Sequence, residues 1–462
     1  MILYLINPSN PLVSLAKSKE SHWNRFTAWK PLGLLVLAGL TPKEWDITVF
    51  DENFGKPDYS KLPQPDLVGI SAFTSQAQRA YAVAAEFRAR KVPVVMGGIH
   101  ASMCAEEAGK NVDSVVCGEA EGVWSQVLAD VRNGSLKPVY KGERQDLACV
   151  PAARHDLLPH GYFFGSIQIS RGCPLACSFC SVTAFNGGHF RRRPIANVIE
   201  EFKLMKEKHI LIVDDNLIGT RADQVEHTKE MFRQMIAAKL NKKWIAQVTI
   251  NMADDDELLR LAAAAGCFGV FIGFESVKKE GLEEIHKKFN IQHGRNMKAS
   301  IRRIQKHGIN AVGSFIIGLD IDKKYIGRDI ARAARSYGLD ALNVMFLTPL
   351  PGTDLWNKML SENRITANDF PNDWKYYTLT FPVAKYMHLT WSDMLSEKDS
   401  CYRNFYAYPH ILRRTNSSLW HFRNPFVTLI SNMVFRINTL RFDRKTYENF
   451  DVSRGHSNAV PG

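Results

Sequence analysis

The sequence predicts an α/β fold with two successive parallel sheets. Apolar runs of strand length alternate with helix-length segments along most of the 462 residues, which is the pattern of βαβ units. Many of these runs end in glycine, asparagine or aspartate, as strands do where a sheet faces a ligand. We therefore expect an N-terminal doubly wound, Rossmann-like domain, then a partial (βα)6 barrel of TIM type, and a mostly helical C-terminal region.

The composition excludes several classes of protein. Hydrophobic residues make up 45% and charged residues 23% of the chain, so a disordered, collagen-like or polytopic membrane protein is excluded. The net charge of +12 fits nucleic acid, an anionic membrane or an anionic ligand, and does not choose between them. The opening segment has no basic region of a secretory signal, and no long apolar run suggests a spanning helix. The cytoplasm, where thiols stay reduced, is the expected location.

The first domain is expected at residues 1–140. The carboxyl ends of its strands are the candidate ligand side, because open α/β sheets bind ligands there. A linker rich in proline and glycine is expected at residues 141–165. Apolar runs predict strands at 2–6, 47–50, 67–70, 92–96 and 114–116, and helices over 33–40, 76–90 and 121–131.

The barrel is expected at residues 166–350. Six repeats suit a partial barrel, because a closed one has eight. One helix, over 254–265, is predicted to begin at Asp254, with Glu257 completing a capping box. Residues 351–462 form an aromatic-rich, basic C-terminal domain. The barrel strands are predicted at 166–170, 210–213, 244–249, 268–272, 311–317 and 342–347, with a further helix over 223–238.

Three cysteines carry the strongest chemical signal. Cys173, Cys177 and Cys180 follow a predicted strand with the spacing C-x3-C-x2-C. Zinc prefers four ligands in paired spacings, and no second pair follows nearby. Three thiolates on one loop instead suit three corners of a [4Fe–4S] cluster, with the fourth iron open to a non-protein ligand. Inert buried thiols or part of a zinc site are the alternative. The remaining cysteines are expected to be small buried hydrophobes: Cys104, Cys117, Cys149, Cys267 and Cys401.

On this motif, residues 160–350 resemble the radical S-adenosylmethionine (SAM) enzymes. The resemblance implies that SAM chelates the open iron and is cleaved to methionine and a 5′-deoxyadenosyl radical. For the two aspartates and the glutamate among the implied contacts, a solvated helix N-terminus is the alternative. The implied SAM contacts are Phe179, then Asp214, Asp215 and Asn216 after the second barrel strand, and Gly273, Glu275 and Ser276 after the fourth.

The first domain resembles the cobalamin-binding domains that are fused to radical SAM enzymes. The resemblance rests on VGISAFTS at 68–75, GGIH at 97–100 and CGEAEG at 117–122. The D-x-H-x-x-G motif, whose histidine ligates cobalt in classical domains, is absent, and His100 is the nearest alternative. A Rossmann-like module that binds nothing is the other interpretation. The implied cobalamin contacts are Ser71, Phe73, Thr74, Gly97, Gly98, His100, Gly118, Glu119 and Glu121.

Together the two resemblances imply methylation of an unactivated carbon through methylcobalamin. One alternative keeps the same cofactors but performs radical cyclisation or rearrangement, as in the anaerobic magnesium-protoporphyrin monomethyl ester cyclase. A second is a basic RNA-binding protein with a structural cluster. No catalytic side chain is predicted.

The expected partners are a small, hydrophobic substrate (a lipid or tetrapyrrole) and an electron donor such as flavodoxin or ferredoxin, with no nucleic acid. The family also contains hopanoid methylases, and this similarity favours a lipid as the substrate. A helix over 425–440 either packs on the barrel or lies on a membrane surface. Its flanking cations are Arg423, Arg436, Arg441 and Arg444.

Overall fold

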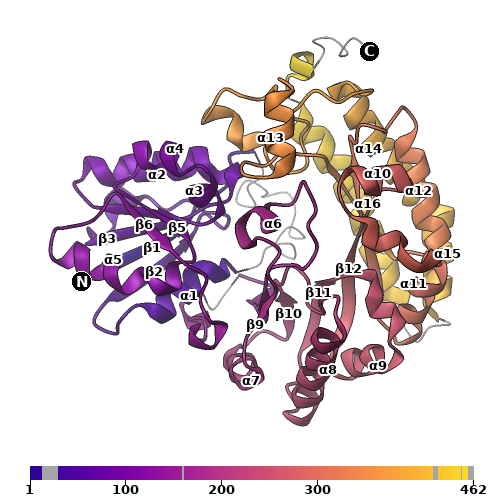
Figure 1. Cartoon of the computed structure of the whole chain (residues 1–462), viewed down its shortest axis with the longest axis horizontal. Helices are drawn as coiled ribbons and strands as arrows, with labels where there is room; N and C mark the ends of the chain where they lie inside the picture. The colour runs from indigo at the N-terminus through magenta and orange to yellow at the C-terminus, as the bar shows by residue number, and fades with distance from the viewer. Residues whose placement is uncertain (13–29, 159–160, 420–424, 449, 456–462) are drawn as a thin grey trace.

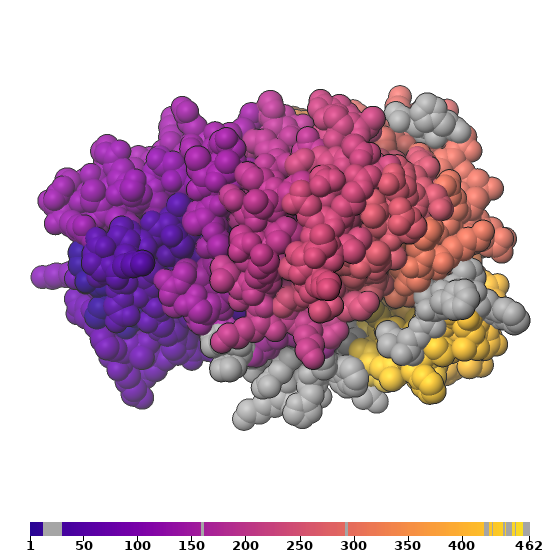
Figure 2. Space-filling view, turned by 90° about the horizontal axis from the view of Figure 1, so that it is seen from below, coloured from indigo at the N-terminus to yellow at the C-terminus, as the bar shows by residue number. Residues whose placement is uncertain are grey.

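The computed structural model describes residues 1–12, 30–158, 161–419, 425–448 and 450–455. Figure 1 shows a first α/β domain, a second sheet with helices on its outer side, and a helical C-terminal region packed beside that second sheet. Figure 2 shows the first domain and the C-terminal helices at opposite ends of the molecule. Arg423 lies outside the described residues, as do the side chains of Arg441 and Arg444.

The first sheet is fully parallel, with strand order β2-β1-β3-β4-β5-β6. This is the doubly wound order 2-1-3-4-5 of flavodoxin-like folds, extended by one strand, and it confirms the predicted class. The central strands are apolar throughout because helices cover both faces of the sheet. The elements are β1 (Ile2–Asn7), α1 (Leu32–Leu40), β2 (Asp46–Asp51), β3 (Leu67–Ser71), α2 (Ala77–Ala89), β4 (Val94–Gly97), α3 (Ile99–Met103), α4 (Ala105–Asn111), β5 (Ser114–Gly118), α5 (Trp124–Arg132) and β6 (Val139–Gly142).

The sixth strand was not predicted. It crosses the expected domain boundary at residue 140 and pairs with β5 at the edge of the sheet. Only Tyr140 of its four residues is buried, so the segment lacks the apolar run by which the other strands were found.

The second sheet contains six parallel strands in the order β7-β10-β11-β12-β13-β14, and β8 and β9 form a separate antiparallel pair. This open arrangement confirms the predicted partial barrel. The expected strand 166–170 divides in two, because Ser170 and Arg171 leave the sheet to pair with β9. The elements are β7 (Phe164–Ile167), β8 (Ser170–Arg171), α6 (Ser181–Asn186), β9 (Arg191–Arg192), α7 (Ile195–Leu204), β10 (His209–Ile212), α8 (Ala222–Ala237), β11 (Lys243–Val248), α9 (Asp256–Ala264), β12 (Cys267–Glu275), α10 (Lys279–Glu284), α11 (Met297–Lys306), β13 (Asn310–Ile317), α12 (Ile326–Tyr337) and β14 (Ala341–Phe346).

The predicted cap of α9 was wrong by one residue. Asp255 is the N-cap, and its carboxylate accepts a hydrogen bond from the Leu258 backbone N–H at 2.9 Å. Asp254 lies in the preceding 3-10 turn and accepts a hydrogen bond from Arg295 Nη2 at 2.7 Å. Adjacent aspartates have equal capping preference, so the sequence alone left the register open.

The C-terminal region is helical, as predicted, and its aromatic residues form core. Trp374 and Trp391 are 2% and 1% exposed. Trp374 Nε1 donates to Glu107 Oε1 of the first domain at 2.9 Å, so this region also contacts the first sheet's helices. No helix in the described part of the chain is long and apolar enough to cross a bilayer. The helices are α13 (Asp354–Ser361), α14 (Trp391–Phe405), α15 (Tyr408–Leu419) and α16 (Pro425–Tyr447).

Candidate functional site

The three cysteines lie on the loop between β8 and α6. None of them forms a disulfide; Cys177 is buried, and the other two are half-buried. The loop begins at Gly172, whose φ is +85° and where an added Cβ would lie 1.9 Å from the carbonyl oxygen of His189. Only glycine fits this position, which explains the residue before the first cysteine.

Two aspartates at the end of β10 hold the start of this loop. Asp214 accepts hydrogen bonds from the backbone N–H groups of Ile169 and Ser170, each at 2.7 Å, and from Ser170 Oγ at 2.6 Å. Its side chain is fully buried, and burial raises its pKa to about 7. Asp214 is therefore placed to support the loop, and its burial does not support the predicted SAM contact. Asp215, half-buried, accepts from the Gly172 N–H at 3.0 Å.

A buried ion pair lies beside the cysteine loop. Lys287 Nζ is 2.6 Å from Glu275 Oε1, and both side chains are at most 10% exposed. Glu275 ends β12 at a φ of +62°, a conformation that is costly for a non-glycine residue. Gly273 leaves room for the pair, because an added Cβ would lie 2.6 Å from Lys287 Nζ. The Glu275 Oε2 atom is buried and has no hydrogen-bond partner among the described residues.

The environment of the thiols fits an iron–sulfur cluster. Burial raises the pKa of all three, to about 12 for Cys177, and the Lys287 ammonium acts on each in the opposite direction. Backbone N–H groups of the loop and of α6 donate to Cys173 and Cys180, and Asn216 Nδ2 lies 4.0 Å from Cys173 Sγ. Such donors stabilise thiolates that bind iron.

Among the described residues, no three His, Cys, Asp or Glu side chains are grouped as ligands of one metal ion. The case for a [4Fe–4S] cluster therefore rests on the spacing of the three cysteines and on the donors around them.

The remaining predicted SAM contacts lie on the cysteine loop and at the ends of β10 and β12, which β11 separates in the sheet. Phe179 is half-buried on the cysteine loop, and Asn216, 1% exposed, follows β10. Ser276 is 8% exposed and accepts from the Lys278 N–H at 3.2 Å. Gly273 lies within β12, two residues before Glu275. All of them except Phe179 thus lie at the carboxyl ends of β10 and β12, the face of the barrel on which ligands bind.

The predicted cobalamin loops follow three adjacent strands, β3, β4 and β5. Ser71 ends β3 and packs close to Gly98, where an added Cβ would lie 2.9 Å from Ser71 Oγ. Gly98 has a φ of +90°. Phe73 is 64% exposed, whereas Thr74 beside it is 7% exposed. Gly97 ends β4, and Gly118, at a φ of +83°, ends β5.

His100 lies beneath these loops. Its imidazole is fully buried, with Nε2 2.8 Å from Tyr81 Oη and 3.5 Å from Glu107 Oε1. The ring also packs edge-on against Trp374 of the C-terminal region. His100 therefore joins the core of the first domain to that of the C-terminal region. Its burial argues against a role as a cobalt ligand.

The predicted cobalamin residues Glu119 and Glu121 face the barrel. Glu121 Oε1 accepts from Arg171, two residues before the first cysteine. Glu119 accepts from Arg191 Nη1 at 3.0 Å, and its Oε2 lies 3.4 Å from Arg171 Nη1. The side chains of both glutamates and of Arg171 are at most 15% exposed. These ion pairs tie the loop between β5 and α5 to the strand pair β8–β9, from which the cysteine loop begins.

The two candidate loops lie against each other. Helix α6 follows Cys180 directly, α3 follows Gly98 directly, and the two helices are in contact. Figure 1 shows α6 between the first domain and the second sheet. Sequence reasoning missed Arg171, Arg191 and Lys287 as members of this site. The one signal in the sequence that could have indicated any of them is the position of Arg171 directly before Gly172 and Cys173.

Comparisons with known proteins match both parts of the chain. Residues 24–128 match the B12 binding domain, and residues 167–333 match the radical SAM superfamily. The bacteriochlorophyllide d C-12(1)-methyltransferase of Chlorobaculum tepidum is 30% identical over 342 residues, which cover 71% of this chain and 73% of that protein. The hopanoid C-2 methylase of Rhodopseudomonas palustris is 28% identical, over 73% of this chain and 66% of that protein.

The fold has solved counterparts. The radical SAM methyltransferase TsrM of Kitasatospora setae, solved with tryptophan and a SAM analogue, superposes with a TM-score of 0.60 at 18% identity, over 78% of this chain and 76% of TsrM. That likeness concerns the fold alone. With the sequence matches, it leads to one conclusion: this chain belongs to the family of cobalamin-dependent radical SAM methyltransferases.

Proposed function

We propose that this chain methylates an unactivated carbon of a hydrophobic small molecule, a tetrapyrrole or a lipid such as a hopanoid. The observation that carries the proposal is the contact between the two loops, where Arg171 joins the cysteine loop to Glu119 and Glu121. Radical formation and methyl delivery must act on one substrate carbon, so the two cofactor sites have to face each other. The names of the two sequence relatives supply the substrate classes.

The residues divide into three roles. Cys173, Cys177 and Cys180 would hold three irons of the cluster. Phe179, Asp215, Asn216, Gly273, Glu275 and Ser276 would contact SAM, with Asp214 supporting the loop beneath. Ser71, Phe73, Thr74, Gly97, Gly98 and Gly118 would contact cobalamin. When bound, these cofactors supply the electron, the 5′-deoxyadenosyl radical and the methyl group.

The protein's own contribution is to orient and to shield. The Lys287–Glu275 pair places one buried cation beside the three thiols. The glycines of the first domain let a ligand approach the backbone closely. The ion pairs of Arg171 fix the distance between the two loops, because a small displacement of reacting groups costs a large factor in rate.

The direct test is incubation of the anaerobically reconstituted enzyme with methyl-labelled SAM, reduced flavodoxin as the proposed electron donor, and bacteriochlorophyllide d or a hopanoid. A labelled methyl group in the product together with 5′-deoxyadenosine supports the proposal. Abundant 5′-deoxyadenosine with a modified but unlabelled product contradicts methyl transfer and favours radical cyclisation or rearrangement.

We also propose that α16 lies on a membrane surface when substrate is collected. Among its described side chains, the helix exposes a row of apolar residues and buries two polar ones, the reverse of an ordinary surface helix. Phe426, Ile430 and Ile437, at helical spacing, are 72%, 50% and 45% exposed, whereas Thr428 and Asn432 are 4% and 1% exposed. Exposed apolar side chains in such a row suit the headgroup region of a bilayer.

Liposome co-sedimentation tests this contact. The double variant Phe426→Ser, Ile430→Ser should sediment less with vesicles than the unaltered chain. The control is Leu204→Ser, which removes a comparably exposed apolar residue, 62% exposed, from the barrel. Equal sedimentation of all three chains would contradict the proposal.

A further inference from the structure

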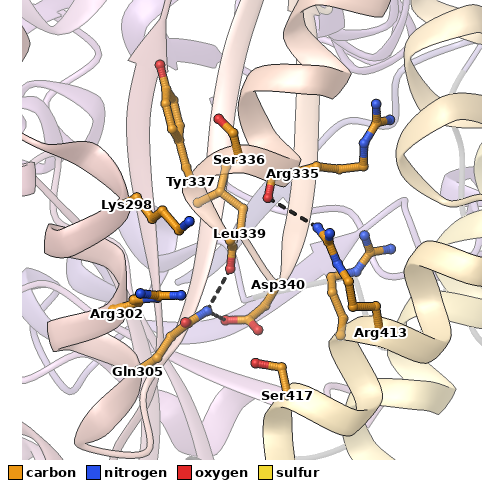
Figure 3. Close-up of a pocket in the computed structure, with 12 residues that line it drawn as sticks. Lys298, Arg302, Gln305, Arg335, Ser336, Tyr337, Leu339, Asp340, Arg413 and Ser417 are labelled. Atoms are coloured by element: carbon orange, nitrogen blue, oxygen red, sulfur yellow. Dashed lines mark hydrogen bonds between the residues drawn. The ribbon is translucent and has the colours of Figure 1, made fainter.

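A basic cavity of about 460 Å³ lies on the outer side of the barrel, between α11, α12 and α15. Figure 3 shows its lining, with Lys298 and Arg302 from α11, Arg335 near the end of α12, and Arg413 from α15. Arg414 is the fifth cation of the lining, and Asp340 is the one carboxylate. The cavity therefore carries an excess of four positive charges.

The cavity is remote from the site described above. Most of its lining lies near helix carboxyl ends, with Gln305 on α11 and Arg335 on α12, and Asp340 directly precedes β14. Lys298, near the start of α11, is the exception. In a βα barrel the helices run back from the ligand face, so their carboxyl ends lie at the amino-terminal ends of the strands. The cysteine loop lies at the opposite face, and Figure 1 shows α6 far from α11 and α15.

Four of the five cations of this cavity form no ion pair with any residue that the structure describes: Lys298, Arg302, Arg335 and Arg413. The Arg335 and Arg413 guanidinium groups donate hydrogen bonds to backbone carbonyl oxygens only. Burial together with the charges of Arg413 and Arg332 lowers the pKa of Arg335. Mutual repulsion of this kind is relieved when an anion binds.

A buried donor gives a second, independent indication of a ligand. Arg414 is 8% exposed. Its Nε donates to Asn432 Oδ1 at 2.9 Å and its Nη1 to the Phe405 carbonyl oxygen at 3.1 Å. Its Nη2 is buried and has no partner among the described residues. An unpaired buried guanidinium N–H is costly unless a ligand accepts from it.

We propose that this cavity is a binding site for a phosphate ester or diphosphate. Guanidinium groups recognise phosphate oxygens through paired, charge-assisted hydrogen bonds. The volume is that of a small-molecule site and exceeds what a lone phosphate fills. A ligand at this end of the barrel does not enter the reaction; it anchors or regulates the enzyme from the opposite face. The inference does not depend on the proposed methylation.

The test is calorimetric titration of the full-length protein with pyrophosphate and with ATP at low ionic strength. Binding is expected, and it should weaken as salt is added. Arg302→Gln and Arg413→Gln should each reduce the affinity about tenfold or more, the loss expected for one charge-assisted contact. Both side chains are exposed, so the variants should fold. Unchanged iron content would verify that the cysteine site is intact.

Arg328→Gln is the matched control: it removes the same charge from α12, one of the helices that line the cavity, but Arg328 contacts Tyr325 at the other end of that helix. A vesicle arm, phosphatidylcholine with or without phosphatidic acid, distinguishes a lipid phosphate from a soluble one. Binding of pyrophosphate, ATP or phosphatidic acid vesicles that the two cavity variants weaken supports the site. Absence of binding in every arm, or an equal loss in Arg328→Gln, would overturn it.

Discussion

The ammonium of Lys287 lies 2.6 Å from Oε1 of Glu275. It is the ammonium, not the pair, that supplies positive charge to all three thiols, and the Glu275 carboxylate opposes it at Cys177. A reduced cluster carries one more negative charge than an oxidised one, so a nearby cation stabilises the reduced form. The pair therefore links the end of β12 to the redox chemistry expected of the cysteine loop.

Replacing Lys287 by methionine should lower the midpoint potential of the cluster by tens of millivolts, on the order of what one screened charge supplies. An EPR-monitored redox titration measures this. Lys288→Met is the control, because Lys288 is adjacent but 65% exposed, where solvent screens its charge. Identical potentials in both variants would show that Lys287 is only structural.

Replacing Arg171 by glutamine should uncouple the two halves of the reaction. The cluster should still assemble and SAM should still be cleaved, but methylated product per 5′-deoxyadenosine should fall roughly 10- to 100-fold, because the loops lose their fixed spacing. The control is Arg132→Gln, which breaks a surface ion pair with Glu44 within the first domain. It should leave the ratio of methylated product to 5′-deoxyadenosine unchanged. A parallel loss of SAM cleavage and methyl transfer would argue against a positioning role.

Gly98→Ala should weaken cobalamin binding at least about tenfold. The new Cβ would lie 2.9 Å from Ser71 Oγ and 3.0 Å from the Ala72 nitrogen, at a φ of +90°. Gly134→Ala provides the comparison, since Gly134 also has a positive φ, +66°, but has open space around it. Cobalamin absorbance after gel filtration reports binding. Full retention by Gly98→Ala would remove this loop from the cobalamin site.

Acid stability should depend on Glu201, which joins the segment before the barrel to α7. Its carboxylate lies 3.0 Å from His155 Nε2 and 2.7 Å from Arg193 Nη1, and it is 1% exposed. Burial alone would raise the pKa of Glu201, but these two partners outweigh it and hold the pKa below its usual value. A lowered native pKa means that the stabilisation is present above the unfolded pKa of about 4.3 and is lost as pH falls below it.

Glu201→Gln should therefore lower the free energy of unfolding by about 3–5 kcal/mol at neutral pH. The free energy of unfolding of this variant should also fall less between pH 7 and pH 4 than that of the unaltered chain. Urea unfolding at pH 7 and pH 4 measures both effects. Glu200→Gln, at the neighbouring position and 68% exposed, should change stability by less than about 0.5 kcal/mol. Equal effects of the two variants would contradict the buried-pair argument.

Periodicity and local motifs were enough to predict the two sheets and the cysteine loop. The apolar runs of β1, β3, β10 and β13 are local features, and so is the C-x3-C-x2-C spacing. Strand β6 of the first sheet was not predicted, because an edge strand with one buried residue has no apolar run.

The contacts within the site could not be predicted, because they join residues far apart in the chain. Glu119 and Glu121 were expected to hold a cofactor, yet they meet Arg171 and Arg191 across the domain boundary. His100 follows a glycine-rich strand end, as a ligand-binding residue would, and only its packing against Tyr81, Glu107 and Trp374 shows that it is buried.

The central claim is that the cysteine loop holds a [4Fe–4S] cluster with one iron open to SAM. The most direct measurement is iron content and 5′-deoxyadenosine formation after anaerobic reconstitution, comparing the unaltered chain with Cys173→Ala, Cys177→Ala and Cys180→Ala combined. Cys149→Ala is the control, because the Cys149 thiol is exposed rather than buried as the sequence predicted. The unaltered and control chains should bind about four irons and cleave SAM, and the triple variant should do neither. A triple variant that still binds iron and cleaves SAM would contradict the account.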